Sequence, residues 1–286
     1  MSLLQEYKSS LKDVAIEESV DLFIFRPMAF LFVKVIYPTD ITPNQVTLLS
    51  MIVGVLSGIC YATGEGSMVV MGGILLGFAT VFDCADGQLA RLKKNGTHLG
   101  RVLDGVVDYI YTIAAFLGVA VGCRNESMGL GLWWLFAVSA GASYAIQAGF
   151  LDYYRNEYLA HARGRRGFLS QEIEEVAREQ EKLSKEQGHY VEKFLLRVYL
   201  KYSRFQNQLE LKRKTDSDVN SSRYVQENAV MIHLWSINGT STHVFVLILC
   251  SAFGRVDLFL WYILVFGSLY SFLLHIIETF RAKAAR

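Results

Sequence analysis

Six long apolar stretches constrain the fold of this chain more than any other feature of its sequence. They cover residues 46–62, 68–90, 102–122, 128–150, 242–253 and 258–280. A helix that crosses a bilayer needs about 20 predominantly apolar residues, so the fifth stretch is short unless residues 237–241 belong to it. The chain is 52% hydrophobic and only 19% charged, whereas soluble domains carry about 25% charged residues. We therefore predict an all-α polytopic membrane protein with six transmembrane helices.

A shorter apolar segment lies ahead of these stretches. Residues 22–37 are mostly apolar, but Arg26, Pro27 and Lys34 interrupt them. A helix that combines apolar residues with charges in this way suits the surface of a membrane better than its core. We expect an interfacial amphipathic helix before the first span.

The basic residues predict how the spans are oriented. They gather after the second, fourth and sixth apolar stretches, at Arg91, Lys93, Lys94, Arg101, Arg155, Arg163, Arg165, Arg166, Arg281, Lys283 and Arg286. The opposite connections carry at most one basic residue each. By the positive-inside rule both termini face the cytosol, as does the connection between spans two and three. We expect an integral protein of the cell (cytoplasmic) membrane. The arginines after the fourth stretch either reflect this topology, which we favour, or hold an anionic acceptor.

The connection between the fourth and fifth spans is unusually long and polar. Within it, residues 171–187 are charge-rich, as in a solvated helix, and the apolar residues between 191 and 209 recur at steps of three and four. That spacing is typical of an amphipathic helix. Because Lys193, Arg197, Lys201 and Arg204 share the segment, its apolar face either lies on an anionic membrane surface or packs on a neighbouring helix or subunit.

These patterns divide the chain into four parts. Residues 1–40 are a cytosolic N-terminus with the interfacial helix, and residues 41–153 hold the first four spans. Residues 154–235 are a cytosolic, mostly helical insertion. Residues 236–286 contain the last two spans and a cytosolic C-terminus.

Four aspartates occur at helical spacing inside this apolar sequence. Asp83 and Asp86 end the second stretch, and Asp104 and Asp108 begin the third. An ionised Asp in a bilayer core costs roughly 2.5–3.5 kcal/mol, so four would cost on the order of 10 kcal/mol if the costs added. Two antiparallel helices joined by a short turn would aim all four at one point. Hard oxygen ligands of this kind suit Mg²⁺ or Mn²⁺, and a pair of such ions is the natural partner.

The residues around the aspartates form a longer pattern. It reads D-x2-D-G-x2-A-R-x8-G-x3-D-x3-D from Asp83 to Asp108. The pattern resembles the signature of the CDP-alcohol phosphotransferase family at every position. The family's six-helix architecture, with an interfacial helix ahead of the first span, agrees with the apolar stretches. The residues from Thr42 to Thr47 also resemble the start of the family's first span. The resemblance covers about residues 38–150.

The resemblance implies a role for each residue of the pattern. Asp83, Asp86 and Asp104 would hold two divalent cations, Mg²⁺ or Mn²⁺, with Asp108 also near them. Asp108 would act as the general base on the acceptor hydroxyl, whose oxygen attacks the β-phosphorus of a CDP-linked donor and releases CMP. The remaining positions would serve the donor: Gly87 and Ala90 by permitting its close approach, Arg91 by pairing with phosphate, and Asn44 and Thr47 by lying near it.

The resemblance leaves the substrates open. We favour CDP-diacylglycerol as donor and a polar alcohol as acceptor, in phospholipid biosynthesis. CDP-choline or CDP-ethanolamine with diacylglycerol, or a CDP-polyol with a soluble acceptor, are alternatives. A homodimer in the membrane is implied by the family, and we expect no nucleic-acid partner.

A different class of function is also compatible with intramembrane acids, namely an ion or metal transporter with a carboxylate site. Other metal-ligating residues offer no competing site. His98, His233, His243 and His275 form no ligand set in sequence, and the scattered cysteines include no CxxC pair.

Overall fold

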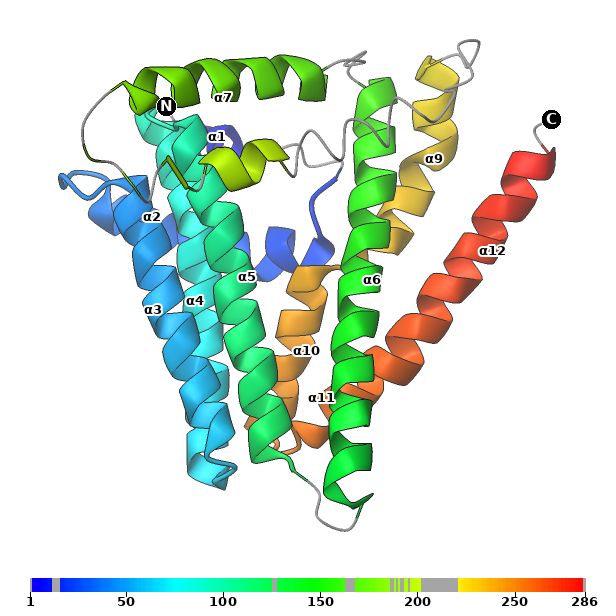
Figure 1. Ribbon diagram of the computed structural model, residues 1–286. Helices are drawn as coiled ribbons and strands as arrows, with labels where there is room; N and C mark the ends of the chain where they lie inside the picture. The colour runs from blue at the N-terminus through cyan, green and yellow to red at the C-terminus, as the bar shows by residue number, and fades with distance from the viewer. Residues whose placement is uncertain are drawn as a thin grey trace.

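The computed structural model describes residues 2–11, 16–124, 128–162, 168–185, 188, 190, 193–194, 196–201 and 221–284. Figure 1 shows a bundle of long helices, and the described residues contain no strand. Six segments are long and apolar enough to cross a membrane: Pro43–Ala62, Gly66–Lys93, Leu99–Gly122, Leu130–Leu159, Tyr224–Ala252 and Asp257–Arg281. The predictions of an all-α fold and of six spans are therefore confirmed.

The chain begins with short helices at one end of the bundle. Helix α1 (Leu3–Ser10) starts with a capping box between Ser2 and Gln5. A π-helical turn, η1 (Asp21–Phe25), runs directly into α2 (Arg26–Ile36). On α2, Ala29 and Val33 are buried whereas Leu31 and Val35 are 66% and 74% exposed. One side of α2 therefore packs on the bundle and the other exposes apolar residues, an arrangement that is compatible with the predicted interfacial helix.

Helix α3 (Pro43–Ala62) packs along both α4 (Gly66–Lys93) and α5 (His98–Gly122), which contact each other much less. Glycines permit the close approach, because a Cβ on Gly118 of α5 would overlap the carbonyl oxygen of Gly58 on α3. Small residues serve the same purpose in many membrane helix pairs, where the backbones can then pack tightly. These three helices form the half of the bundle that carries the aspartates.

Sequence signals at the helix ends fix how these three helices begin and end. The Thr42 side chain accepts a hydrogen bond from the amide of Gln45, and Pro43 occupies the first turn of α3. Lys94 ends α4 in the left-handed conformation, with φ 54°. Thr97 then caps α5 by accepting from the Gly100 amide at 2.9 Å. The short turn makes α4 and α5 antiparallel neighbours at the aspartate end.

The second half of the bundle is more open (Figure 1). It consists of α6 (Leu130–Ala162), α9 (Ser221–Ser236), α10 (Thr240–Ala252), α11 (Asp257–Trp261), the π-helical turn η3 (Tyr262–Gly267) and α12 (Ser268–Ala284). The fifth apolar stretch includes residues 237–241 and reaches back to Tyr224, with a turn between α9 and α10. The segment that we assigned to the insertion, residues 154–235, therefore begins inside α6 and ends inside α9.

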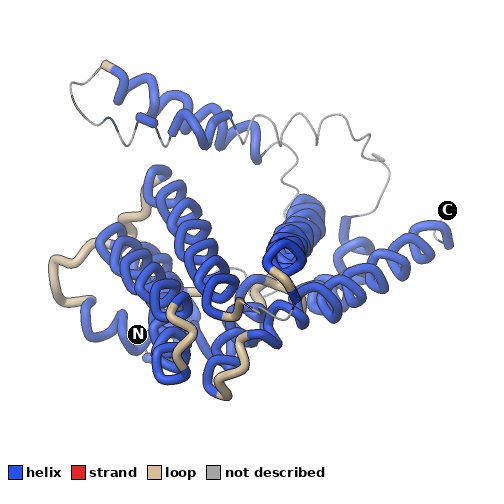
Figure 2. Tube along the Cα trace, turned by 60° about the horizontal axis from the view of Figure 1, so that its bottom comes forward, coloured by secondary structure: helices blue, strands red, loops and turns tan. Residues whose placement is uncertain are grey.

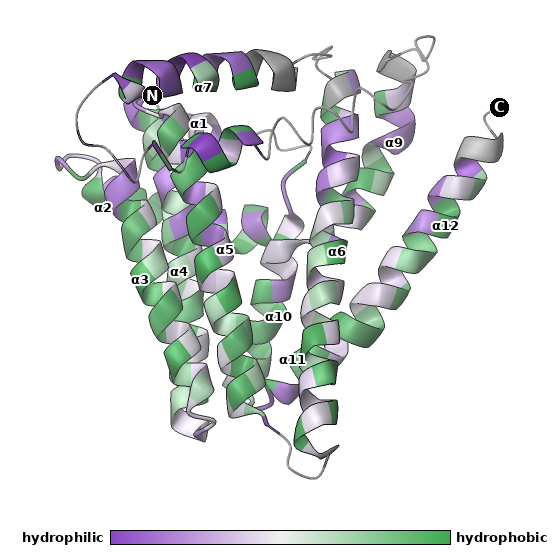
Figure 3. Cartoon of the chain, viewed as in Figure 1, coloured by the Kyte–Doolittle hydropathy of each residue, from purple (hydrophilic) through white to green (hydrophobic). Residues whose placement is uncertain are grey.

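The insertion contributes helix α7 (Phe168–Ser184), which lies across the aspartate end of the bundle (Figure 1). In the rotated view of Figure 2, α7 runs beside the spans and not among them. In Figure 3, hydrophobic residues dominate the spans, whereas hydrophilic residues dominate the end of the bundle that α7 covers. That end has the composition of a membrane–water boundary.

Candidate functional site

Three of the four aspartates converge between α4 and α5. Asp83 comes from α4, and Asp104 and Asp108 come from successive turns of α5. One carboxylate oxygen from each lies within 4.8 Å of the others. In the described part of the chain, the Oδ1 atoms of Asp83 and Asp108 are buried without a hydrogen-bond partner. A buried, unpaired carboxylate oxygen is costly unless a cation approaches it. The donor set and its orphaned oxygens therefore fit a divalent metal ion.

The fourth aspartate is hydrogen-bonded to α3 and is not part of this group. Asp86 is only 3% exposed, and its Oδ2 accepts a hydrogen bond from the Thr47 hydroxyl. Asp86 is not among the three residues whose oxygens converge. The structure thus brings Asp83, Asp104 and Asp108 together and sets Asp86 beside them, oriented by Thr47.

Arg91 lies across the open face of Gly87, one turn earlier on α4. A Cβ on Gly87 would be 3.4 Å from both terminal nitrogens of Arg91, so the glycine leaves the guanidinium room to lie flat. The Nε of Arg91 donates to the carbonyl oxygen of Ser10. Its Nη2 is buried without a partner in the described residues. A donor in that state suits an incoming anion such as phosphate.

Asn44 at the start of α3 lies close to Gly100 at the start of α5. A Cβ on Gly100 would be 3.0 Å from the Oδ1 of Asn44, so the amide occupies space that a larger residue at position 100 would take. Asn44 is exposed at this rim, and Gly100, which it approaches, lies four residues before Asp104 on α5. Ala90 lies further along α4, where its side chain faces Gly96 of the turn. Of the residues predicted to serve the donor, Thr47 therefore contacts an aspartate directly and Asn44 lies at the rim.

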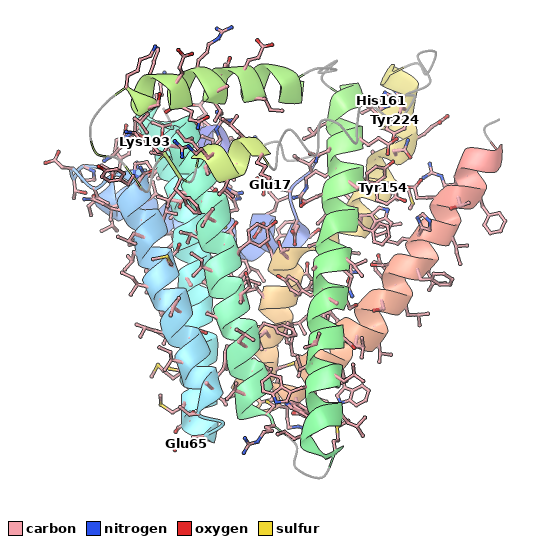
Figure 4. All side chains as sticks on the ribbon, in the orientation of Figure 1. Glu17, Glu65, Tyr154, His161, Lys193 and Tyr224 are labelled. Carbon is pink, nitrogen blue, oxygen red and sulfur yellow. The ribbon has the colours of Figure 1, made fainter. Side chains whose placement is uncertain are left out.

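A buried ion pair behind α4 was not anticipated from sequence. Arg26 and Glu17 approach to 3.0 Å with both side chains at most 6% exposed. The backbone carbonyl of Arg26 also accepts from the Gln88 side chain at 3.1 Å. The sequence signal for this buried pair was a charged residue, Arg26, inside an apolar segment. We had interpreted Arg26 only as part of the interfacial helix. Figure 4 shows Glu17 inside the bundle, near the aspartate end.

A second buried acid joins the N-terminal segment to the other half of the bundle. Glu18 is 3% exposed and accepts from the Thr242 amide, at 3.2 Å, in the first turn of α10. Arg155, in the last third of α6, lies 3.7 Å from the same carboxylate. Burial, followed by the nearby charge of Asp21, raises the pKa of Glu18 to about 8. Arg155, one of the arginines considered for an anionic acceptor, therefore contacts Glu18.

The remaining sequence candidates are placed as follows. Arg163, Arg165 and Arg166 lie outside the described residues, as does the side chain of His98. His243 is buried between the rings of Tyr144 and Tyr262, at centroid distances of 5.2 and 5.7 Å. His243 thus has an aromatic environment, and it is not among the residues whose carboxylate oxygens converge.

Comparison with known proteins adds an independent line of evidence. Residues 40–166, slightly less than half of the chain, match the sequence model of a family described as CDP-alcohol phosphatidyltransferase. Over 112 residues the chain is 30% identical to phosphatidylinositol phosphate synthase of Corynebacterium glutamicum, covering 39% of this chain and 43% of that protein. Over 75 residues it is 32% identical to the bifunctional IPC transferase and DIPP synthase of Archaeoglobus fulgidus, covering 25% and 14% of the two chains.

A similar match involves an animal protein. Over 115 residues the chain is 31% identical to ceramide phosphoethanolamine synthase of Drosophila melanogaster, covering 36% of this chain and 29% of that protein. In each of these cases the chain spans less than half of the relative's length.

Proposed function

Because residues 40–166 belong to the CDP-alcohol phosphatidyltransferase family, we propose that this integral membrane protein transfers a substituted phosphate from a CDP-linked donor to an alcohol, with release of CMP. The observation that carries the proposal is the convergence of Asp83, Asp104 and Asp108 within 4.8 Å. The guanidinium of Arg91, with a buried nitrogen available for an anion, supports it from the same helix as Asp83.

In this proposal the acids bind metal. Asp83, Asp86, Asp104 and Asp108 would hold two divalent cations, Mg²⁺ or Mn²⁺. When bound, such ions neutralise a pyrophosphate and stabilise the charge that develops during phosphoryl transfer. The Thr47 hydroxyl supports the arrangement by fixing the Asp86 carboxylate.

The other residues bind the donor and move the proton. Arg91 pairs with a phosphate oxygen, while Gly87 leaves room for the nucleotide and Asn44 contacts the donor from the rim. An Oδ atom of Asp108 accepts the proton of the acceptor hydroxyl. The acceptor oxygen then forms a bond to the β-phosphorus, the bond from that phosphorus to the bridging oxygen breaks, and CMP departs with the electron pair.

We favour CDP-diacylglycerol as the donor, with a polar alcohol as the acceptor. The similarity to a phosphatidylinositol phosphate synthase supports this choice. The position of the site near the end of membrane-spanning helices supports it too, because a lipid could approach from the side. Similarity to a ceramide phosphoethanolamine synthase supports a second candidate, a CDP-linked polar headgroup donor with a lipid alcohol as acceptor.

The basic residues beside the aspartate end support a site that faces the cytosol, and we propose the cell membrane as the location. A homodimer is proposed from the family resemblance. A cytosolic insertion at residues 154–235 stays a proposal, and its two ends, residues 154–159 and 224–235, overlap the candidate spans Leu130–Leu159 and Tyr224–Ala252.

The proposal is tested by a matrix of donors and acceptors with the purified full chain in detergent. CMP release and mass spectrometry of the lipid product would be measured with Mg²⁺, with Mn²⁺ and with EDTA. We expect one donor–acceptor pair to give CMP and product in equal amounts, and EDTA to abolish both. Metal flux through proteoliposomes without CMP release from any donor would instead favour a transporter and overturn the proposal.

A further inference from the structure

A second surface segment, called the surface helix here and made of the described residues Tyr190, 193–194 and 196–201, lies beside the cytosolic end of α5. All of these residues are helical. At about 100° per residue, side chains four residues apart share one face of a helix. This surface helix carries three such rows, and each has a different chemistry and a different environment.

The first row is buried and attaches the surface helix to the bundle. Leu196 and Leu200 are 1% and 3% exposed. They belong to one apolar cluster with Ile173 and Val176 of α7 and Val102 of α5. This row therefore accounts for the packing on a neighbouring helix that the sequence suggested, and it leaves Phe194 and Val198 exposed.

The second row is apolar and exposed. Tyr190, Phe194 and Val198 are 81%, 64% and 49% exposed. Phenylalanine and valine on the solvent side of a helix gain nothing from water, and three such residues in line form a continuous apolar stripe. The stripe lies outside all six candidate spans, so the lipid contacts of the spans do not explain it.

The third row is basic and runs along one flank of that stripe. It consists of Lys193, Arg197 and Lys201, again at steps of four. The ammonium of Lys193 lies over the Tyr190 ring, 5.9 Å from its centroid. A basic row beside an apolar row is the arrangement with which amphipathic helices bind anionic bilayers: apolar side chains enter the boundary, and cations contact the headgroups.

The surface helix is also at a suitable level. It packs on Val102, near the start of the third span. In Figure 4, Lys193 lies beside the upper end of α5, at the end of the bundle where α2 also lies. Helix α2 exposes its own apolar residues there, including Leu31 and Val35. Two amphipathic elements therefore expose apolar side chains at the same end of the spans.

We propose that the surface helix docks on the anionic surface of the lipid bilayer through Tyr190, Phe194 and Val198, with Lys193, Arg197 and Lys201 against acidic headgroups. The basic row complements the negative charge of acidic headgroups, and this favours an anionic bilayer over an apolar protein partner. The inference does not depend on the proposed chemistry, because it concerns only where this helix and the attached α7 rest.

The test uses the full chain reconstituted in phosphatidylcholine vesicles, with or without about one third phosphatidylglycerol. Phe194→Trp places a reporter on the stripe, and Glu181→Trp places a matched one on α7, at a side chain 70% exposed. Dibrominated phosphatidylcholine quenches indole that enters the bilayer. After subtraction of the wild-type signal, we expect quenching at position 194 to exceed that at 181 at least threefold in the acidic vesicles.

The charge contribution is tested by adding Lys193→Gln, Arg197→Gln and Lys201→Gln to the Phe194→Trp chain. Near an anionic surface each such charge contributes about fivefold in partitioning. We expect the triple variant to lose the additional quenching that phosphatidylglycerol produces, with an unchanged gel-filtration profile in detergent. Equal quenching in both vesicle types, unaffected by the triple variant, would overturn the anionic contact.

Two other outcomes would overturn the docking itself. Quenching at 194 no greater than at 181, with red-shifted emission, would mean that the stripe stays in water. Blue-shifted emission without lipid quenching, varying with the protein-to-lipid ratio, would mean that a second copy of the chain covers the stripe.

Discussion

The hydroxyl of Thr47 on α3 donates a hydrogen bond to the buried carboxylate of Asp86 on α4. This bond joins two helices that pack along each other and that contribute different kinds of group to the site. Asp86 is 3% exposed and Thr47 is 2% exposed, so water does not compete for the contact. The orientation of one predicted metal ligand therefore depends on a neutral side chain 39 residues away.

Removing this hydroxyl should weaken metal binding more than it alters the fold. Thr47→Val keeps the shape of the side chain but leaves Asp86 without its donor. Loss of a partner that orients a metal ligand commonly costs 10–100-fold in affinity or activity. We expect the Mg²⁺ concentration for half-maximal CMP release to rise by about that factor. Thr47→Ser keeps the hydroxyl and should stay within about threefold of wild type; an unchanged Mg²⁺ dependence for Thr47→Val would show that Asp86 needs no orientation.

Asp108 should be required for turnover and not for donor binding. Asp108→Asn keeps the side-chain volume but cannot accept a proton, and loss of a general base typically costs about 10²–10⁴ in rate. Turnover would be measured as CMP release, and donor binding by calorimetry with a CDP-alcohol. Asp83→Asn is the informative comparison, since it should impair metal and donor binding as well. Retained turnover in Asp108→Asn would remove this residue from the role of base.

Arg91 should act through the geometry of its guanidinium and not through charge alone. Its Nε is committed to the Ser10 carbonyl, and the terminal nitrogens lie over Gly87. Arg91→Lys retains a positive charge but loses the planar fork, so we expect the KM for the CDP-linked donor to rise about tenfold. Arg101→Lys, on the exposed first turn of α5, is the matched control and should leave KM unchanged. Equal effects of the two substitutions would contradict a specific phosphate contact.

The contact between α3 and α5 should be sensitive to a single methyl group. A Cβ on Gly118 would overlap the Gly58 carbonyl, whereas a Cβ on Gly105 of the same helix meets nothing within 4 Å. Overpacking of this kind costs about 1–3 kcal/mol. We expect Gly118→Ala to lower the apparent Tm in detergent, followed by tryptophan fluorescence, and Gly105→Ala to leave it unchanged or raise it. A Tm unaffected by Gly118→Ala would mean that the two helices can separate at little cost.

The sequence predicted the parts of this structure that depend on local periodicity. Asp104 and Asp108 are four residues apart, so any helix stacks them on one face, and the apolar lengths defined the six spans. Asp86 is different, because its surroundings depend on α3 packing against α4. No rule of local spacing identifies a partner 39 residues away, and the metal-binding role of all four aspartates remains a prediction.

The buried ion pair of Glu17 and Arg26 shows a similar limit. In the sequence, Arg26 resembled a surface charge of an interfacial helix. In the structure its side chain is buried in the pair with Glu17, and its backbone carbonyl accepts a hydrogen bond from Gln88 on α4. The fifth span was underestimated for a related reason. Its polar residues around Ser236 lowered the local hydropathy, although helix α9 extends the span on the far side of a turn.

Glu18 should make the stability of the protein depend on pH. Burial, with a contribution from the nearby Asp21, raises its pKa from an ordinary value of 4.5 to about 8, while Arg155 and the Thr242 amide act in the opposite direction. Between these values the folded state holds a proton that the unfolded state has released. The stability attributable to the group is therefore present below about pH 4.5 and is lost as pH rises towards 8, with a slope of at most about 1.4 kcal/mol per pH unit.

Glu18→Gln separates this effect from other titrations. The Gln side chain can still accept from the Thr242 amide but carries no charge at any pH. We expect the apparent Tm of wild-type protein in detergent to fall between pH 5 and 8, and that of Glu18→Gln to fall less. Asp257→Asn is the matched control, because that acid pairs with the exposed Arg255 at the opposite end of the bundle. If Glu18→Gln and the wild type lose stability equally with rising pH, the decline must come from other groups, and Glu18 would be ionised in the folded protein.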